Sequence, residues 1–208
     1  MPMNHSPAAE RNQQPIFEYL SPCFKRMRDG RASLHCLEIA SGTGQHSAYF
    51  ASRDSHLIMH PSDQNLGQQE SVALWARHRN VTERVNSLIQ LDVTDSLDHW
   101  PKFNISMIYC ANMVHISPWE ATVGLFRGAG AYLDQNGILA LYGPYRFNSV
   151  PLVVSNQAFD DSLKMRNPLW GIRAIAELDH LGQEFNLRRI ETYTCPANNH
   201  VLIYQKQE

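Results

Sequence analysis

Apolar and polar positions along this chain follow two periodicities. Five short apolar runs have the length and composition of buried strands: residues 34–40, 56–60, 85–91, 103–110 and 137–142. Other stretches carry apolar residues at three- and four-residue spacing, which predicts helices over residues 13–27, 45–52, 64–79 and 118–133. Ser117 is well placed to cap the last of these. Strands alternating with helices predict a mostly parallel sheet.

The last third of the chain has a different pattern. Residues 143–168 are rich in loop signals, with a short helix expected over residues 156–164, and residues 174–184 are again helical. Residues 185–193 and 200–205 then predict two strands joined by a tight turn, which is a hairpin. The expected fold is therefore α/β and Rossmann-like, with a seven-stranded, mostly parallel sheet, an antiparallel terminal hairpin and helices on both faces. This is the layout of class I methyltransferases.

Length and composition narrow the class of protein. A chain of 208 residues fits one domain, residues 1–208. A net charge of −2 and a pI near 6.5 make nucleic acid an unexpected partner. We expect no membrane span, because the chain has no apolar run of about 18 residues, and the polar N-terminus lacks a signal peptide's apolar region. Four cysteines without a C-x-x-C pair indicate reduced thiols and a cytoplasmic location.

A glycine-containing turn follows the first expected strand. Residues 38–44 read Glu-Ile-Ala-Ser-Gly-Thr-Gly, and a helix is expected directly behind them. Because Gly42 and Gly44 have no Cβ, the backbone can turn sharply there and a ligand can approach closely. The helix start offers free N–H groups to a carboxylate, such as the one on the methionine part of S-adenosylmethionine.

Three acids follow three successive strands. Glu38 ends the first strand, Asp63 follows the second at 19 residues beyond Gly44, and Asp92 follows the third. Such carboxylates can reach the cofactor's ammonium through water, both ribose hydroxyls and the adenine amino group, respectively. Each acid alone is explained equally well as a helix cap or a turn former. Together they predict one cofactor crevice.

A nicotinamide cofactor is the main competitor for this turn. The dinucleotide fingerprint has a third glycine where this chain has Ser47, and a glycine where it has Ala40. The terminal hairpin is a further difference from a dehydrogenase. These features favour S-adenosylmethionine as the methyl donor and S-adenosylhomocysteine as the product.

Several longer motifs resemble the methyltransferase-like protein twenty-six family. They lie in residues 7–12 with 15–16, 37–46, 61–63, 112–119 and 141–145, and the resemblance covers nearly the whole chain. The resemblance implies the methyltransferase fold and its cofactor, and alanine at position 40 is expected in this family. It also implies that residues 1–30 form a helical segment over the cofactor, where Arg11 would neutralise the methionine carboxylate. It implies no substrate.

The predicted cofactor site combines the glycine turn, the acids and the family motifs. Its residues are Arg11, Asn12, Glu38, Ala40, Ser41, Gly42, Thr43, Gly44, His46, Asp63, Asp92, Val93, Asn112 and Met113.

The chemistry of methyl transfer sets the remaining candidates. The reaction is an in-line displacement, which needs alignment, exclusion of water and sometimes a base. His115 titrates near neutrality and is a candidate base, with bracing of the Ser117 turn as its alternative role. Tyr145 is a second catalytic candidate. His115, Tyr145 and Arg146 are also predicted to contact the substrate, although Arg146 fits a solvated loop equally well.

Two further expectations concern the lid and metals. Residues 143–172 are predicted to form a substrate lid, or else to cover the edge of the sheet. We expect no metal site, because His56 and His60 have a spacing of four in a strand rather than in a helix.

The predicted function is that of an S-adenosylmethionine-dependent methyltransferase acting on a small molecule. A protein methyltransferase, a non-catalytic cofactor-binding module that binds a partner and an NAD-dependent dehydrogenase are the alternatives. The sequence does not decide the oligomeric state.

Overall fold

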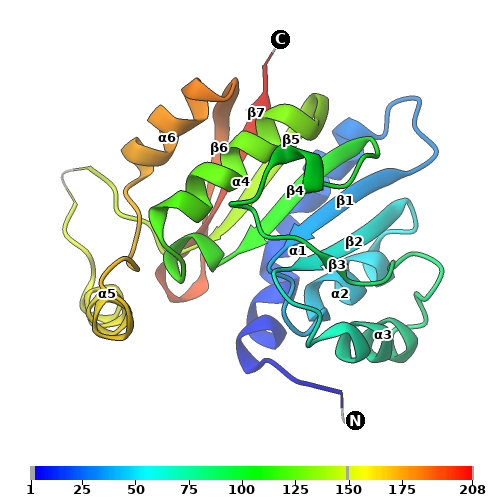
Figure 1. Cartoon of the computed structure of the whole chain (residues 1–208), viewed down its shortest axis with the longest axis horizontal. Helices are drawn as coiled ribbons and strands as arrows, with labels where there is room; N and C mark the ends of the chain where they lie inside the picture. Colours follow the sequence, from blue (N-terminus) through cyan, green and yellow to red (C-terminus); the bar gives the residue numbers. More distant parts are fainter. Residues whose placement is uncertain (1–2, 149, 208) are drawn as a thin grey trace.

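A computed structural model describes residues 3–148 and 150–207 of the chain. Within them, seven strands form one sheet in the order β3-β2-β1-β4-β5-β7-β6 (Figure 1). The strands are β1 Leu34–Ile39, β2 Leu57–Asp63, β3 Ile89–Gln90, β4 Ile105–Ala111, β5 Leu133–Gly143, β6 Leu187–Cys195 and β7 Asn199–Lys206. β1 to β5 pair in parallel, whereas β7 is antiparallel to both β5 and β6. The predicted sheet and hairpin are confirmed.

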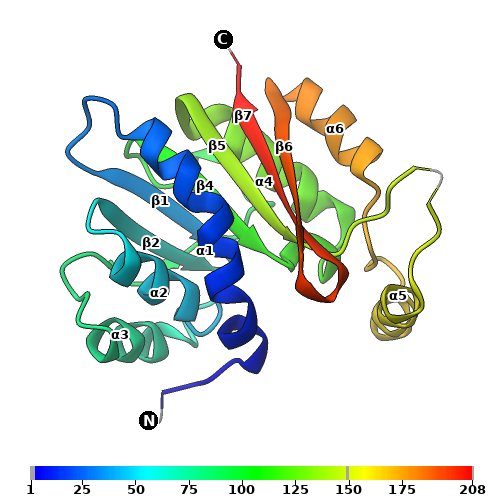
Figure 2. The ribbon, with the colours of Figure 1, turned by 180° about the vertical axis from the view of Figure 1, so that it is seen from behind.

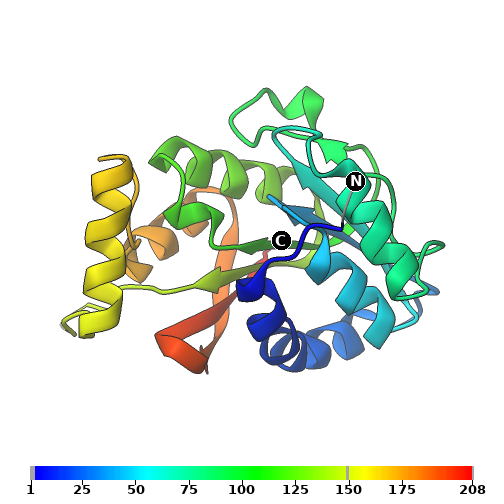
Figure 3. The ribbon, with the colours of Figure 1, turned by 90° about the horizontal axis from the view of Figure 1, so that it is seen from below.

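Helices cover both faces of the sheet. α1 Pro7–Met27, α2 Gln45–Arg53 and α3 Gln69–His78 lie on one face (Figure 2), and α4 Trp119–Tyr132 and α6 Ile175–Glu184 lie on the other. α5 Val154–Arg166 stands at one end of the molecule (Figure 3). Short 3-10 turns are η1 Leu97–His99, η2 Met113–His115 and η3 Pro196–Asn198. No helix in the described ranges is long and apolar enough to cross a membrane.

Each face of the sheet has its own core, because successive side chains of a strand point to opposite sides. In β5, Ile138, Ala140 and Tyr142 pack on the side of α1, whereas Leu139 and Leu141 pack on the side of α4. This alternation decides on which side of the sheet each functional side chain emerges.

The strand order reverses between β1 and β4. β2 and β3 lie to one side of this pair and β5 to the other, while Ile39 in β1 is the register partner of Cys110 in β4. At such a reversal the loops leaving the two strands diverge and open a crevice at the carboxyl edge of the sheet. The glycine turn and the loop from Asn112 onward therefore lie next to each other.

Several predicted boundaries were wrong for local reasons. α1 begins at Pro7 rather than at residue 13, and Ser6 caps it by accepting a hydrogen bond from the Ala9 N–H. α3 begins only at Gln69, because Asp63 and Asn65 accept local backbone N–H bonds that compete with a helix.

The third strand and the cap of α4 also differ from the prediction. Only Ile89–Gln90 forms a regular strand, with one isolated bridge between Met59 and Val85. Pro118 occupies the cap position of α4, and the Ser117 hydroxyl instead donates to the Met113 carbonyl at 2.7 Å.

Candidate functional site

The glycine turn uses left-handed backbone at three positions. The φ angles are +52° at Ala40, +51° at Gly42 and +81° at Gly44. A Cβ on Gly44 would lie 2.8 Å from Val72 Cγ2, so α3 packs directly on the turn. Alanine in this region costs about 1–2 kcal/mol, and Ala40 therefore holds a strained conformation at the edge of the site.

A cavity of about 320 Å³ opens beside this turn, on the α4 side of the sheet. Asp63 and Asp92 provide its two carboxylates. Its other lining residues are Ile39, Ala40, Gln64, Leu91, Val93, Ala111, Met113, Ile116, Ser117 and Ala121. We call this space the acidic cavity. Two carboxylates opposite an apolar wall suit a ligand that has hydroxyl or amino donors and a flat apolar part.

Local hydrogen bonds hold both carboxylates of the acidic cavity. Asp63 Oδ2 accepts from the Gly42 N–H at 3.3 Å, which ties the second strand to the glycine turn. Asp92 Oδ1 accepts from the N–H and the hydroxyl of Thr94 at 2.9 and 2.7 Å. The acids are thus positioned before a ligand arrives, which lowers the entropy cost of binding.

Glu38 lies beneath the turn rather than in the cavity. Its side chain is 2% exposed, accepts a hydrogen bond from the Ser47 hydroxyl and lies 3.5 Å from His46 Nδ1. His46 Nε2 in turn donates to Asn12 Oδ1 at 2.7 Å. The side chain of Asn12 also acts to lower the pKa of the Tyr142 phenol. The polar chain from Glu38 through His46 to Asn12 ties β1, α2 and α1 together.

A second cavity of about 210 Å³ lies on the α1 side of the sheet. Its polar lining residues are Arg11, Asn12, Asn112, Tyr142 and Asn199, and its apolar ones are Ala8, Pro15, Pro196 and Ala197. We call this space the basic cavity. The end of β4 and the loop after it contribute to both cavities, since Ala111 and Met113 line the first and Asn112, at φ +61°, lines the second.

The predicted cofactor residues therefore fall into four groups. Five line the acidic cavity: Ala40, Asp63, Asp92, Val93 and Met113. Three line the basic cavity: Arg11, Asn12 and Asn112. The turn itself holds Ser41, Gly42, Thr43 and Gly44, and beneath it lie Glu38 and His46. Sequence reasoning located one crevice, and the structure divides it into two spaces.

His115 and Tyr145 are not placed to touch a substrate. His115 is 0% exposed and Tyr145 is 2% exposed, and their rings meet edge to face at 4.9 Å in the core on the α4 side. Burial, reinforced by the charge of Arg173, lowers the pKa of His115 to about 3. The predicted roles of both residues in catalysis and substrate binding therefore need correction.

The surroundings of His115 give it a bracing role instead. Its Nδ1 accepts from the Arg173 N–H at 3.5 Å, and its carbonyl accepts from the Gly171 N–H at 3.0 Å. A Cβ on Gly143 would lie 2.4 Å from His115 Nε2, so the glycine makes room for the ring at the end of β5. His115 thus links the loop after β4 to the segment after α5.

Neither Arg146 nor any other described residue of the expected lid lines the acidic or the basic cavity. Arg146 is exposed, and its guanidinium donates to the Ile172 carbonyl at 3.0 Å. Two hydrogen bonds tie α5 to neighbouring loops. Asp160 accepts from the Ile172 N–H, and the Asn156 side chain donates to the Asn198 carbonyl. The segment is thus tied to the loops beside the site, and its role as a substrate lid or as a cover for the edge of the sheet stays a prediction.

Sequence reasoning missed part of the basic cavity. Tyr142 lies three residues before the predicted Tyr145, and strand alternation places it on the α1 side. The alternation of apolar residues in β5 was a signal that could have found it. Residues 196–199 enter the cavity only through the pairing of β7 with β5, which the sequence pattern does not specify.

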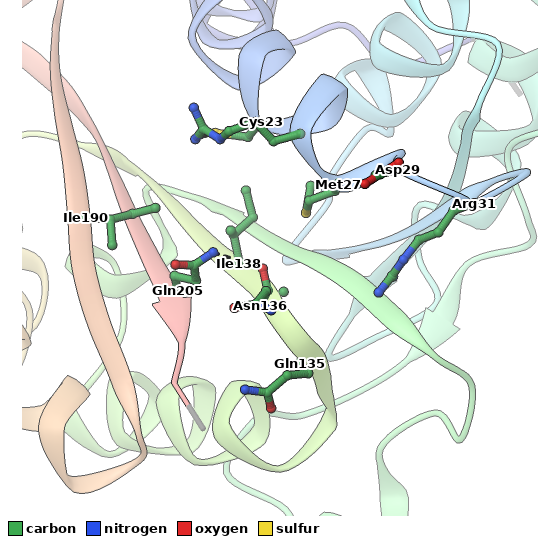
Figure 4. Close-up of a pocket in the computed structure, with 11 residues that line it drawn as sticks. Cys23, Met27, Asp29, Arg31, Gln135, Asn136, Ile138, Ile190 and Gln205 are labelled. Atoms are coloured by element: carbon green, nitrogen blue, oxygen red, sulfur yellow. Dashed lines mark hydrogen bonds between the residues drawn. The ribbon is translucent and has the colours of Figure 1, made fainter.

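A third cavity, of about 250 Å³, lies at the opposite end of the sheet (Figure 4). It is formed by the end of α1, the start of β5 and the end of β7, and holds none of the predicted site residues. Its two cations already have partners, since Arg26 pairs with Glu191 at 2.8 Å and Arg31 pairs with Asp134 at 2.6 Å. This cavity is therefore separate from the candidate site.

The described residues contain no group of three or more His, Cys, Asp or Glu side chains that could hold a metal ion. The candidate site therefore consists of hydrogen-bonding, charged and apolar side chains.

Comparison with known families places the chain in one of them. Residues 3–206 match the family described as "Protein of unknown function (DUF938)". The chain belongs to this family. The match spans the glycine turn, both acids of the acidic cavity and the terminal hairpin, so the candidate site lies inside the region that defines the family.

Solved structures similar to this DUF938 chain include methyltransferases. The S-adenosylmethionine-dependent methyltransferase SibL, in its apo form, is 16% identical with a TM-score of 0.75, over 96% of this chain and 56% of SibL. The mitomycin 7-O-methyltransferase MmcR is 14% identical with a TM-score of 0.71, over 84% of this chain and 49% of MmcR. The chain thus spans about half the length of these two proteins.

A neighbour of more similar length is the magnesium protoporphyrin IX methyltransferase ChlM from Synechocystis PCC 6803, solved with bound SAH. It is 12% identical with a TM-score of 0.68, over 94% of this chain and 83% of ChlM. These likenesses confirm the predicted fold, a Rossmann-like class I methyltransferase fold with an antiparallel terminal hairpin.

Proposed function

We propose that this protein is an S-adenosylmethionine-dependent methyltransferase that acts on a small molecule. The observation that carries the proposal is the acidic cavity, where Asp63 and Asp92 lie beside a left-handed glycine turn at the reversal point of the sheet. The fold supports the proposal, because its structural neighbours include S-adenosylmethionine-dependent methyltransferases.

The residues present fit the cofactor. In this proposal Asp63 accepts hydrogen bonds from the ribose hydroxyls, and Asp92 accepts from the adenine amino group. Val93 and Met113 offer apolar contacts in the same cavity. The Ser41 hydroxyl is buried and has no hydrogen-bond partner among the described residues, so a polar ligand group at the turn would satisfy it.

S-adenosylmethionine, when bound, supplies an activated methyl group and leaves as S-adenosylhomocysteine. The chain's own contribution is to hold and orient the methyl donor and the acceptor, and to exclude water from them. The polar chain through His46 and Asn12 fixes α1 against the turn, and His115 fixes the loop after β4 from behind. We assign these residues positioning roles.

The size of the basic cavity favours a small acceptor over a protein. About 210 Å³ is below the roughly 300–1,000 Å³ of pockets for drug-sized ligands. We further propose that the resemblance to the methyltransferase-like protein twenty-six family reflects membership. We also propose a cytoplasmic location, which the four buried, unpaired cysteines support.

Calorimetry tests the proposed cofactor directly. The purified full chain should bind both S-adenosylmethionine and S-adenosylhomocysteine at one site per chain, and NAD should give no heat under the same conditions. Binding of neither methyl-donor ligand would contradict the proposal, and saturable NAD binding that excludes S-adenosylhomocysteine would replace it with a dehydrogenase.

A further inference from the structure

The charge of the basic cavity is opposite to that of its neighbour. Its lining, taken from the described residues, contains the guanidinium of Arg11 and no Asp, Glu, His, Lys or Cys. The remaining polar groups are three asparagines and one tyrosine, which offer hydrogen bonds without negative charge. A ligand that enters this space therefore meets one positive charge and no acid.

Arg11 has no ionic partner among the described residues, a property that it shares with exposed arginines such as Arg53 and Arg188, but of these three it is the one that lines the basic cavity. Arg26, Arg31 and Arg189 pair with acids at 2.6–2.8 Å. By contrast, no hydrogen bond or ion pair to another described residue involves the Arg11 guanidinium, which is exposed at the cavity. A guanidinium without an ionic partner can bind a carboxylate or a similar anion through two parallel hydrogen bonds. The asparagines and the tyrosine of the same lining can donate further hydrogen bonds to that anion.

Tyr142 adds a second hydrogen-bond donor to this lining. None of the described residues accepts a hydrogen bond from the Tyr142 O–H, so this group can donate to a ligand in the cavity. Burial raises the pKa of Tyr142 above its ordinary value, although Asn12 and the Arg11 charge act in the opposite direction. Tyr142 is therefore a neutral donor rather than a base.

No group in this lining can remove a proton near neutral pH. The base candidate from the sequence, His115, is enclosed on the α4 side of the sheet. A neutral alcohol would need such a base before it could attack a methyl group. A nucleophile that is already ionised would not.

We infer that the basic cavity is the acceptor site and that the methyl acceptor is a small organic anion, which Arg11 and Tyr142 bind. The inference rests on the proposed function. The acceptor's ionised oxygen or sulfur uses a lone pair to form the new bond to the methyl carbon. The electron pair of the broken carbon–sulfur bond stays on the donor sulfur, which becomes a neutral thioether, and no proton moves.

The test compares two probes of the same shape and different charge. Benzoate and benzamide are titrated by calorimetry into the full chain saturated with S-adenosylhomocysteine. We expect benzoate to bind roughly tenfold more tightly, because a hydrogen bond to a charged group adds about 1.4 kcal/mol or more. Equal affinities, or binding of neither probe, would overturn the inference.

Two variants assign that preference to the cavity. Arg11→Gln should remove the preference for benzoate, whereas Arg188→Gln, which changes an exposed arginine of β6 outside the cavity, should keep it. Tyr142→Phe should weaken benzoate binding about fivefold through the loss of one donor. If Arg11→Gln keeps the preference and instead weakens S-adenosylhomocysteine binding, Arg11 belongs to the cofactor and the inference fails.

The two proposals fail separately in this design. A chain that does not bind S-adenosylhomocysteine contradicts the proposed function before any probe is added. A chain that binds it and shows no preference for benzoate contradicts only the acceptor class.

Discussion

The two cavities at the carboxyl edge of the sheet share a loop and differ in charge. The acidic cavity opens on the α4 side with Asp63 and Asp92, and the basic cavity opens on the α1 side with Arg11. Because successive residues emerge on opposite sides at a strand end, one edge offers two surfaces with separate chemistry. Asn112 marks the boundary between them, since its left-handed backbone turns it away from Ala111 and Met113.

This separation suits two ligands of opposite charge. In the proposed function the methyl donor is a sulfonium cation and lies with the acids, and in the further inference the acceptor is an anion and lies with the arginine. Each ligand then meets a complementary field. The following experiments test whether the cavities are as independent as this comparison implies.

Acid should destabilise the fold through two buried histidines, one of which, His115, braces the loop between the cavities, and this is the largest effect we expect. Burial, and then the neighbouring His35, lowers the pKa of His60 to about 4, and burial and Arg173 lower that of His115 to about 3. Both folded values lie below the unfolded value of about 6.5. The stabilisation from neutral histidine is therefore complete above pH 6.5 and lost as the pH falls toward 4.

The measurement is the free energy of unfolding in urea between about pH 7 and about pH 4. Each histidine should contribute a slope of up to about 1.4 kcal/mol per pH unit, which sums to several kcal/mol. His60→Asn and His115→Asn should each reduce the slope. An unchanged slope in both variants would show that neither histidine titrates on unfolding in this range.

Gly44→Ala should damage the acidic cavity through its backbone. The left-handed backbone and the 2.8 Å approach to Val72 should together lower the free energy of unfolding by about 3 kcal/mol. Gly30→Ala is the matched control, because Gly30 has φ +70° and open space around it, and it should cost only about 1 kcal/mol. If both variants lost the same free energy of unfolding, packing against Val72 would contribute nothing to the effect of Gly44→Ala.

Asp63→Ala should weaken S-adenosylhomocysteine binding by about 2 kcal/mol, or roughly thirtyfold. The variant loses the proposed ribose contacts and also the bond from the Gly42 N–H. Calorimetry gives the affinity, and Asp161→Ala, in an exposed residue of α5, should leave it unchanged. If the benzoate preference disappeared together with the cofactor affinity, the two cavities would not be independent.

Ala40→Gly should have the smallest effect, and it should be favourable. Removing the Cβ relieves the left-handed strain of about 1–2 kcal/mol, and the greater freedom of glycine in the unfolded chain offsets about 0.5–1 kcal/mol of it. We expect a free energy of unfolding that is higher by up to about 1 kcal/mol. A loss of stability would indicate that the Ala40 methyl group makes a contact the fold requires.

Local rules account for most of what the sequence predicted correctly. Strand and helix order follows from hydrophobic spacing, and the acids at positions 63 and 92 follow buried strands whose carboxyl ends meet at one edge. The errors came where local chemistry competed with the pattern, as at Ser117 and at the start of α3. The third strand is only two residues long, shorter than predicted, because it pairs only with the end of β2.

Tertiary pairing decided the rest of the candidate site. Tyr142 and Tyr145 are close in sequence, but only Tyr142 faces a cavity, because β5 packs α1 on one side and α4 and α6 on the other. The sequence presents His115 as a candidate base, and only the packing of Gly143, Tyr145 and Arg173 shows that it is enclosed.

The sequence by itself determined the order of the elements, the glycine turn and the acids beside it, since each of these depends on residues near one another in the chain. The tertiary structure decided that the crevice is two cavities, and that Arg11 lies with Asn199 in one of them. Those two residues are far apart along the chain and meet only after β7 has paired with β5. Such a contact leaves no mark on the hydrophobic pattern of a single sequence, because that pattern specifies which face is buried and not what covers it.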